Sequence, residues 1–331
     1  MQIINSRRLL LLVTASAILI VGILAATINK HPSVNKGPGL SDSYGFIWEA
    51  PDTSVIPLTE PGLLIRYGRD LIANTAYYFG PKGKVAAISN GMNCQNCHLN
   101  AGTKSWGNNY SAVFSTYPRF RERSGTIENV YKRVNDCIER SLNGHPIDSN
   151  SREMQAMAAY INWLGNNVPK NIKPSGAGIR DIEFLDRPAD PSNGQTVYVQ
   201  KCQRCHGVSG LGVFNADSIS YQYPPLWGNN SYNTGAGLFR MSRFAGYVRD
   251  NMPFDAPHNS TPVTDEEAWD VAAFVNSQPR PKKDISKDYP NIAGKPVDYP
   301  YGPFKDAFTE QQHKYGPFEP ILLAREKSKG K

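Results

Sequence analysis

Two motifs of the form Cys-x-x-Cys-His, at residues 94–98 and 202–206, carry the most specific chemistry in the sequence. Each motif supplies two thiols and an adjacent imidazole: Cys94, Cys97 and His98 in the first, and Cys202, Cys205 and His206 in the second. This spacing is typical of covalent c-type haem attachment, in which the thiols bond the haem vinyl groups and the histidine ligates the iron. The sequence therefore predicts two covalently bound haem c groups.

A partial internal repeat indicates where the second axial ligand of each iron lies. The segment 158–162 (AAYIN) matches 272–276 (AAFVN), so the two halves follow one plan. In the second half, Met252 follows a helical pattern and precedes Pro253, which ends the helix and leaves the thioether in a loop. Methionine opposite histidine is a usual ligand pair of electron-transfer haems. We expect Met252 to be this ligand and the alternative, Met241, to pack in the core.

Cys137 is the only cysteine outside the two motifs. The repeat aligns residues 134–137 with the segment that ends at Met252, so Cys137 stands where the methionine is expected. Two alternatives to iron ligation by Cys137 remain open. One is an inert thiol on an apolar helix stripe, since free cysteines are often buried. The other is ligation by His145, which lies in a Gly-His-Pro turn.

Arginines close to Cys137 favour ligation by its thiolate, because a cation beside a thiol lowers the thiol pKa. Arg133, Cys137 and Ser141 are spaced by four residues and therefore share one face of the expected helix. Three further arginines lie just upstream, namely Arg119, Arg121 and Arg123. For most of these arginines the alternative is a solvated charge or a partner of a haem propionate. Guanidinium groups also bind oxyanions bidentately, so a thiolate-ligated haem beside arginines suggests chemistry on an anionic sulfur compound.

Hydrophobic spacing predicts a mainly α fold with two tandem cytochrome c-like domains, each around one covalently attached haem. The expected helices are 61–78, 127–141, 152–164, 194–201, 238–250 and 265–276. Thr126 and Thr264 are the expected N-caps of the second and the last of these helices. The predicted organisation is a hydrophobic segment (1–28), a lead-in (29–60), domain 1 (61–167), a linker (168–190), domain 2 (191–280) and an extended C-terminal strap (281–331).

The N-terminal residues predict an extracytoplasmic protein. An apolar run at residues 9–28 follows Arg7 and Arg8. It fits either a cleaved secretory signal peptide or an uncleaved anchor, and its length of about 20 residues favours the anchor. Either interpretation predicts the periplasm, with attachment to the inner membrane if residues 9–28 are retained. The net charge of +7 arises at the two termini, so the composition does not support nucleic-acid binding.

Three segments resemble the dihaem thiosulfate dehydrogenases. They are residues 91–103 (GMNCQNCHLNAGT), 117–125 (YPRFRERSG) and 133–144 (RVNDCIERSLNG). The resemblance covers about residues 60–285. Two positions depart from the family pattern: Leu142 stands where methionine is common, and Asn251 stands where some members carry a second, switching ligand.

The resemblance implies a set of site residues. It implies an active-site haem with the axial ligands His98 and Cys137. It implies an electron-exit haem with the axial ligands His206 and Met252. The residues for which it implies substrate positioning are Arg123, Arg133 and Ser141.

The implied reaction couples two thiosulfates to tetrathionate and passes electrons, one at a time, to an external acceptor such as a small cytochrome c or a terminal oxidase. By family analogy, the Cys137 sulfur leaves the iron and forms a transient adduct with the outer sulfur of the substrate. Two other functions remain open. One is a non-catalytic dihaem electron carrier, and the other is a tetrathionate reductase that uses the same site.

Overall fold

The computed structural model describes residues 42–254, 260 and 262–329 of the chain. The predicted apolar segment at residues 9–28 lies outside these residues. Within the described part, no helix has both the length and the apolar composition that crossing a bilayer requires.

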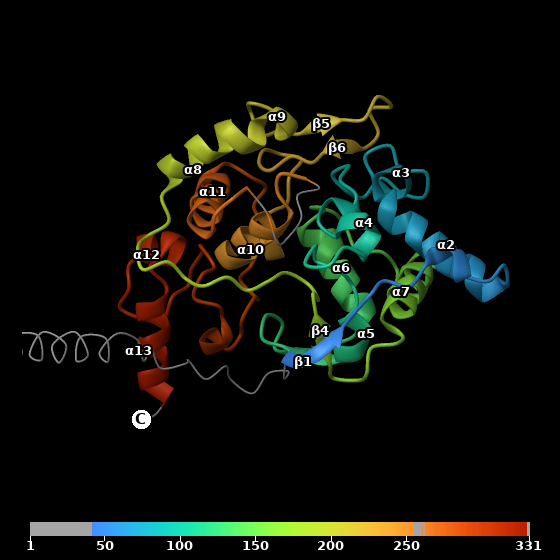
Figure 1. Cartoon of the computed structure of the whole chain (residues 1–331), viewed down its shortest axis with the longest axis horizontal. Coiled ribbons are helices and arrows are strands. Elements are labelled where there is room, and N and C mark those ends of the chain that lie inside the picture. The colour runs from blue at the N-terminus through green and yellow to red at the C-terminus, as the bar shows by residue number, and fades with distance from the viewer. Residues whose placement is uncertain (1–41, 255–259, 261, 330–331) are drawn as a thin grey trace, which may run out of the picture. The chain divides into compact units, whose positions relative to one another are not determined.

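Helices surround both Cys-x-x-Cys-His motifs, and the predicted mainly α fold is confirmed (Figure 1). The helices of the first half are α2 (Glu60–Ala73), α3 (Thr75–Phe79), α4 (Leu99–Gly102), α5 (Val113–Thr116), α6 (Val130–Arg140) and α7 (Arg152–Gly165). Those of the second half and the tail are α8 (Pro191–Val197), α9 (Gln203–His206), α10 (Met241–Asn251), α11 (Asp265–Ser277), α12 (Glu310–Tyr315) and α13 (Glu319–Lys329). Single 3-10 turns are η1 (Thr53–Val55), η2 (Cys94–Asn96), η4 (Gly237–Phe239) and η5 (Ile292–Gly294), and η3 (Tyr198–Cys202) is a π-helical turn.

The strands of the described part are short and form three two-stranded pairs. The parallel pair is β1 (Asp42–Ile47) with β4 (Lys173–Ser175). The antiparallel pairs are β2 (Arg119–Arg121) with β3 (Thr126–Glu128), and β5 (Val213–Phe214) with β6 (Tyr221–Tyr223). The β2–β3 hairpin carries the upstream arginines, with Arg119 and Arg121 in β2 and Arg123 in the turn.

The same close helix crossing occurs in both halves, where α2 packs on α7 and α8 packs on α11. At the first crossing, a Cβ atom on Gly68 would lie 1.9 Å from the carbonyl oxygen of Ala156. At the second, a Cβ atom on Gly194 would lie 1.9 Å from the carbonyl oxygen of Asp270. Only glycine allows backbones to approach so closely. The sequence repeat is therefore matched by a repeat in helix packing.

Helix α6 begins later than the sequence pattern predicts, and the predicted N-cap at Thr126 is wrong. Thr126–Glu128 instead form β3, where the buried Glu128 pairs with Arg121 at 4.0 Å. The true N-cap is Asn129, whose side chain accepts a hydrogen bond from the Lys132 amide at 2.9 Å. Asparagine is an equally good N-cap, and pairing with β2 removes the first predicted turn from the helix.

The last helix of the second half begins where the sequence predicts. Thr264 caps α11 by accepting a hydrogen bond from the Glu267 amide at 3.2 Å, and the Glu267 carboxylate accepts one from the Thr264 amide at 2.9 Å. This reciprocal capping box is a local signal, which explains why the sequence was sufficient to find it.

The C-terminal tail, residues 281–331, contains more structure than an extended strap. Up to α12 it is irregular apart from the η5 turn, as predicted. It then forms α12 and α13 and buries Phe318 and Ile321. The Phe318 ring packs on Trp269 of α11, with 5.8 Å between ring centroids. The tail is therefore fixed to the second half by a small apolar contact that its mostly polar sequence did not reveal.

The segment between the two halves, residues 168–190, also has a structural role. Besides forming β4, it braces the loop that follows the first motif. The carbonyls of Gly176 and Gly178 accept hydrogen bonds from the amides of Trp106 and Asn108, at 2.8 and 2.9 Å. This bracing matters for the histidine of the first motif, as described below.

The glycine at the α8–α11 crossing gives a stability prediction. We expect Gly194→Ala to lower the free energy of unfolding by about 2 kcal/mol or more, because overpacking costs about 1–3 kcal/mol and here the added Cβ would meet rigid backbone. Chemical denaturation of the holoprotein, followed by circular dichroism, measures this loss. Gly237→Ala is the matched control, since a Cβ on that exposed glycine would have no atom within 4 Å. Equal midpoints for the two variants would contradict the close crossing.

Candidate haem and substrate site

The first motif forms a tight turn that is anchored to the start of α3. The amides of Cys97 and His98 both donate to the carbonyl of Cys94, at 3.1 and 2.9 Å. The Cys94 amide donates to the Thr75 hydroxyl at 3.0 Å. This backbone geometry holds two thiols and an imidazole within one turn, as the attachment of a single haem requires.

A backbone carbonyl orients the His98 imidazole. Its Nδ1 lies 2.5 Å from the carbonyl oxygen of Asn108, and because a carbonyl can only accept, Nδ1 donates this hydrogen bond. The unprotonated Nε2 is then the nitrogen that can ligate a metal. The Tyr110 ring stacks on the imidazole, with 4.5 Å between centroids. Burial lowers the pKa of His98 to about 4, so the imidazole is neutral, as a ligand must be.

The second motif repeats this arrangement with different partners. His206 is buried, and its Nδ1 donates to the carbonyl oxygen of Pro224 at 2.8 Å. Burial lowers the pKa of His206 as well. Both imidazoles therefore present a free Nε2, and the residues of both motifs fit a histidine-ligated iron.

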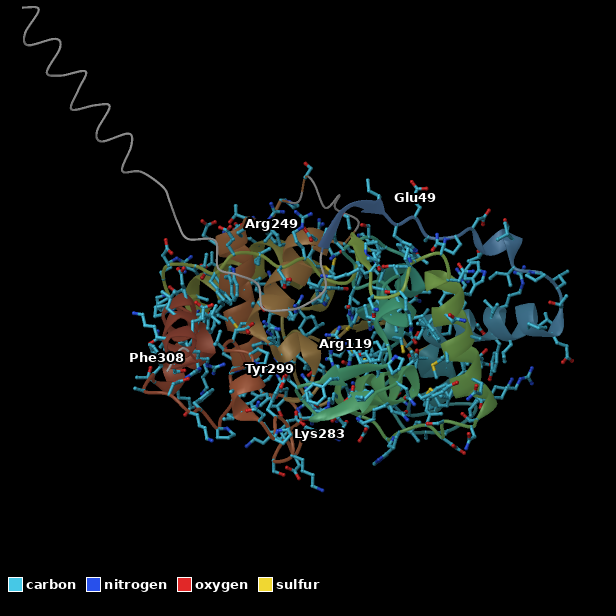
Figure 2. All side chains as sticks on the ribbon, turned by 90° about the horizontal axis from the view of Figure 1, so that it is seen from below. Glu49, Arg119, Arg249, Lys283, Tyr299 and Phe308 are labelled. Carbon is cyan, nitrogen blue, oxygen red and sulfur yellow. The ribbon has the colours of Figure 1, made fainter. Side chains whose placement is uncertain are left out.

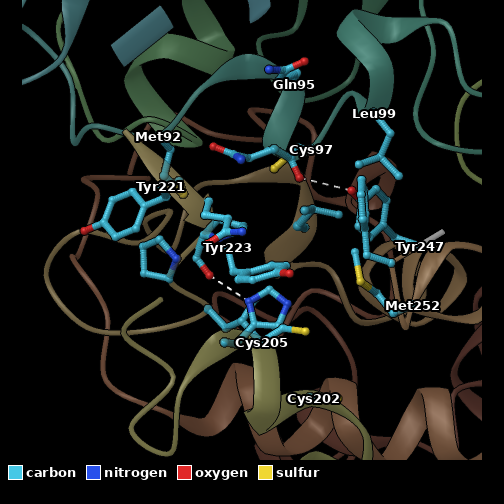
Figure 3. Close-up of a pocket in the computed structure, with 18 of the residues that line it drawn as sticks. Met92, Gln95, Cys97, Leu99, Cys202, Cys205, Tyr221, Tyr223, Tyr247 and Met252 are labelled. Carbon is cyan, nitrogen blue, oxygen red and sulfur yellow. Dashed lines mark hydrogen bonds between the residues drawn. The ribbon is translucent and has the colours of Figure 1, made fainter. Parts of the chain in front are cut away.

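A cavity of about 450 Å³ adjoins the second motif, and its lining is mainly apolar (Figure 3). Cys202, Cys205 and His206 line it from one side, and Met252 lines it from the end of α10. Helix α10 ends at Asn251, and Met252 has an extended backbone. Two thiols, an imidazole and a thioether thus border one apolar space. This is the donor set that a His/Met-ligated haem c needs.

Met241, the alternative methionine, hydrogen-bonds another side chain. Asn251, which stands where some family members carry a switching ligand, hydrogen-bonds two backbone carbonyls. Met241 is fully buried, and its Sδ accepts a hydrogen bond from the Nδ2 of Asn276 at 3.8 Å. The buried Asn251 donates from its Nδ2 to the carbonyls of Trp106 and Tyr247, at 3.1 and 3.0 Å. Of these side chains, Met252 alone lines the cavity together with the second motif.

Helix α6 brings Cys137 to the first motif. Burial and, after it, the neighbouring Cys137 raise the pKa of Cys97 to about 12. Cys137 also contributes, after burial, to raising the pKa of Cys94 and that of Tyr110. Its sulfur therefore lies near both haem-attaching thiols. Cys137 is partly exposed, unlike a sealed core thiol. The rival ligand His145 is exposed in an irregular loop after α6. The geometry therefore suits Cys137 as the group opposite the first histidine.

Arg133 has no carboxylate ion-pair partner among the described residues. Cys137 is the largest influence on it and raises the pKa of Arg133, whereas burial lowers it. The Arg133 guanidinium makes no ion pair or hydrogen bond with any residue that the structure describes. Arg123, by contrast, donates to the carbonyl of Gly235 at 3.0 Å and to the hydroxyl of Tyr299. Of these two predicted positioning residues, Arg133 has no hydrogen-bond partner among the described residues, whereas Arg123 already uses two of its five N–H donors.

Arg140 lies on the same face of α6, although no sequence pattern indicated a role for it. At roughly 100° per residue, Arg133, Cys137, Arg140 and Ser141 fall within an arc of about 100°. Ser141 is the C-cap of α6, and its amide donates to the Cys137 carbonyl at 2.8 Å. Arg140 donates to both carboxylate oxygens of Asp288, at 2.7 Å each. Asp288 belongs to the tail, where no sequence pattern pointed to the site.

The first motif packs directly against the cavity of the second. Tyr247 of α10 donates from its hydroxyl to the carbonyl of Asn96, inside the first motif, at 3.1 Å (Figure 3). Cys97 and Leu99 line the same cavity as Cys205. The two attachment sites therefore share a wall, which suits electron transfer between two bound redox groups.

Comparisons with known proteins agree with this arrangement. The family described as SoxA/TsdA, cytochrome c domain, matches residues 84–169, and the cytochrome c family matches residues 191–279. A thiosulfate dehydrogenase of Psychrobacter arcticus is 36% identical over 73% of this chain and 71% of that protein. One of Allochromatium vinosum is 33% identical over 72% of this chain and 90% of that protein.

A solved structure gives the same result for the fold. It is the thiosulfate dehydrogenase TsdBA from Marichromatium purpuratum in its as-isolated form, with a TM-score of 0.66 and 26% identity. The similarity covers 82% of this chain and 54% of that one, so this chain spans about half the length of that protein.

The fold and the two motifs define a tandem cytochrome c protein that binds two covalently attached haem c groups, as the sequence predicts. The chain belongs to the thiosulfate dehydrogenase family. The domain boundaries, the axial ligands and the positioning residues remain predictions.

The ligand assigned to the second iron can be tested by measuring the reduction potential of that haem. We expect Met252→Ala to lower the reduction potential of one haem and leave the other unchanged, because methionine ligation raises the potential. An optical redox titration of the holoprotein measures both. Met241→Leu is the matched control and should shift neither potential. The assignment is wrong if the Met241 variant, and not the Met252 variant, changes a potential.

Proposed function

We propose that this chain oxidises two thiosulfates to one tetrathionate in the periplasm. The observation that carries this proposal is Cys137 beside Arg133, which has no carboxylate ion-pair partner among the described residues. A sulfur nucleophile and a free guanidinium on one helix face suit a small anion with a terminal sulfur at one end and oxygens at the other. The relatives named thiosulfate dehydrogenase support the same substrate.

The chain's own residues divide the chemistry between them. Arg133 binds the sulfonate oxygens and so directs the outer sulfur of thiosulfate towards the Cys137 sulfur. The Cys137 thiolate and the outer sulfur form an S–S bond with the release of two electrons. A second thiosulfate then attacks that outer sulfur, which forms tetrathionate and restores the Cys137 thiolate. Each haem c, when bound, supplies one-electron redox chemistry, so two haems suit a two-electron oxidation.

We assign the second domain to electron exit. The hydrogen bond from Tyr247 to Asn96 holds the first motif against the second cavity, and this packing supports a short path between the two centres. The acceptor is an external one-electron carrier, such as a small cytochrome c or a terminal oxidase. Residues 9–28, if retained, would anchor the protein to the inner membrane.

The Cys137 thiol is the proposed nucleophile, so its removal should abolish turnover. We expect Cys137→Met to lower the rate at which thiosulfate reduces the haems by at least about 10³-fold, as loss of a covalent nucleophile does, while both haems stay attached. The assay follows reduction of the oxidised, purified holoprotein by thiosulfate alone. His145→Ala is the matched control and should retain wild-type activity.

The same assay separates the competing functions. A wild-type protein that thiosulfate does not reduce would be an electron carrier rather than an enzyme. Turnover of tetrathionate by reduced protein, without thiosulfate oxidation, would indicate a reductase. Wild-type activity in Cys137→Met would contradict the role of the thiol.

Arg133 should contribute mainly to substrate binding. We expect Arg133→Gln to raise the KM for thiosulfate by about 10- to 100-fold, the range for loss of a hydrogen-bonded charge partner. The salt dependence of kcat/KM should weaken in the same variant, because one attractive charge is lost. Steady-state kinetics at several ionic strengths measure both effects. An unchanged KM would exclude Arg133 from the anion site.

A further inference from the structure

The C-terminal tail reaches the arginine cluster, although its sequence gave no sign of this. The Tyr289 amide donates to the carbonyl of Arg123 at 2.7 Å. Lys283 pairs with Glu139 at the end of α6, at 3.2 Å. Figure 2 labels Lys283 and Tyr299 on this part of the tail, next to the hairpin that begins at Arg119. The tail therefore covers both the hairpin and the C-terminal end of α6.

Asp288 of the tail is shared between two arginines. It makes a bidentate ion pair with Arg140, and its Oδ2 also lies 3.9 Å from the Nε of Arg123. The Asp288 and Arg140 side chains are only 8% and 13% exposed. The positive charge of Arg123 opposes the rise in the pKa of Arg133, so these two guanidinium groups lie near each other. Two guanidinium groups therefore share one carboxylate, and the third, that of Arg133, has no ion-pair partner among the described residues. This leaves an excess of positive charge beside Cys137 that suits a dianion.

Tyr299 and its neighbours hold Arg123 in one orientation. The Tyr299 hydroxyl accepts a hydrogen bond from Nη2 of Arg123, and the carbonyl of Gly235 accepts one from Nη1 at 3.0 Å. The rings of Tyr299 and Tyr289 lie 5.4 and 6.0 Å from the guanidinium carbon, within the range of cation–π contact.

The hydrogen bonds to Gly235 and Tyr299 use two of the five N–H donors of Arg123. Its Nε is buried and has no hydrogen-bond partner among the described residues. A buried N–H without a partner is costly, so the orientation must be maintained by the tail and by Gly235. An arginine held in this way, close to Arg133 and with a second N–H on each of Nη1 and Nη2 still unused by these bonds, is preorganised to bind an oxyanion.

We propose that Asp288 and Tyr299 are positioning residues of the substrate site. They hold Arg123 beside Arg133, so that both guanidinium groups bind the sulfonate oxygens of a thiosulfate at Cys137. This inference rests on the proposed function. It makes the tail a third part of the active site, in addition to the two haem domains.

The first test compares two tyrosines of the tail in the full-length holoprotein. Tyr299→Phe should raise the KM for thiosulfate by about tenfold and leave kcat within about twofold, because it removes a hydrogen bond to a charged group that binds substrate. Tyr301→Phe is the matched control. The Tyr301 ring lies 5.1 Å from that of Tyr299, but its buried hydroxyl has no hydrogen-bond partner among the described residues. The KM of this variant should equal that of the wild type.

A double-mutant cycle shows whether Tyr299 acts through Arg123. In an Arg123→Ala background, Tyr299→Phe should change the KM by less than about twofold. Additive effects would contradict the proposal, as would an unchanged KM in the single Tyr299 variant. Asp288→Asn should raise the KM in the same way and should also lose its effect in the Arg123→Ala background.

Two further measurements make these outcomes unambiguous. Unchanged haem spectra and unfolding midpoints in Tyr299→Phe separate positioning from a general structural defect, and a collapse of either would contradict the proposed role. The wild-type assay separates this inference from the function on which it rests. An active wild type with an unaffected Tyr299→Phe variant contradicts the positioning alone, whereas an inactive wild type contradicts both.

Discussion

In each half, one hydrogen bond from a histidine Nδ1 to a backbone carbonyl fixes the imidazole on which the rest of the site depends. The acceptors are Asn108 for His98 and Pro224 for His206, at 2.5 and 2.8 Å. The first acceptor is itself held by the segment between the halves, since the Asn108 amide donates to Gly178 at 2.9 Å. That segment is therefore a structural support of the first haem site, and not only a connection between domains.

The distribution of charge on α6 gives the first site its chemical character. Arg140 has a carboxylate partner in Asp288, whereas Arg133, two turns earlier on the same face, has none among the described residues. Because Cys137 lies between them, the proposed nucleophile is flanked by one neutralised cation and one available cation. A fully paired set of charges would leave no attraction for a dianion. The incomplete pairing is thus the feature that favours a small sulfur oxyanion.

The sequence was sufficient where the signal is local, and insufficient where tertiary contacts decide. The two motifs and the capping box of Thr264 depend on residues within a few positions of one another. The start of α6 was mispredicted, because pairing of β3 with β2 outweighs the helical propensity of residues 126–128. The contacts of Asp288 and Tyr299 join residues that are 148 and 176 positions apart in the sequence, across the linker and the whole second domain, and no periodic pattern marks them. The axial ligands rest on the repeat and on geometry, and they remain predictions.

The most direct test of the account is the stoichiometry of the reaction. Purified holoprotein, as the only protein, would be supplied with thiosulfate and a one-electron acceptor, and sulfur products and reduced acceptor would be quantified together. The account predicts one tetrathionate and two reduced acceptors for every two thiosulfates consumed. Sulfite or sulfate as the main product, or no acceptor reduction, would contradict it.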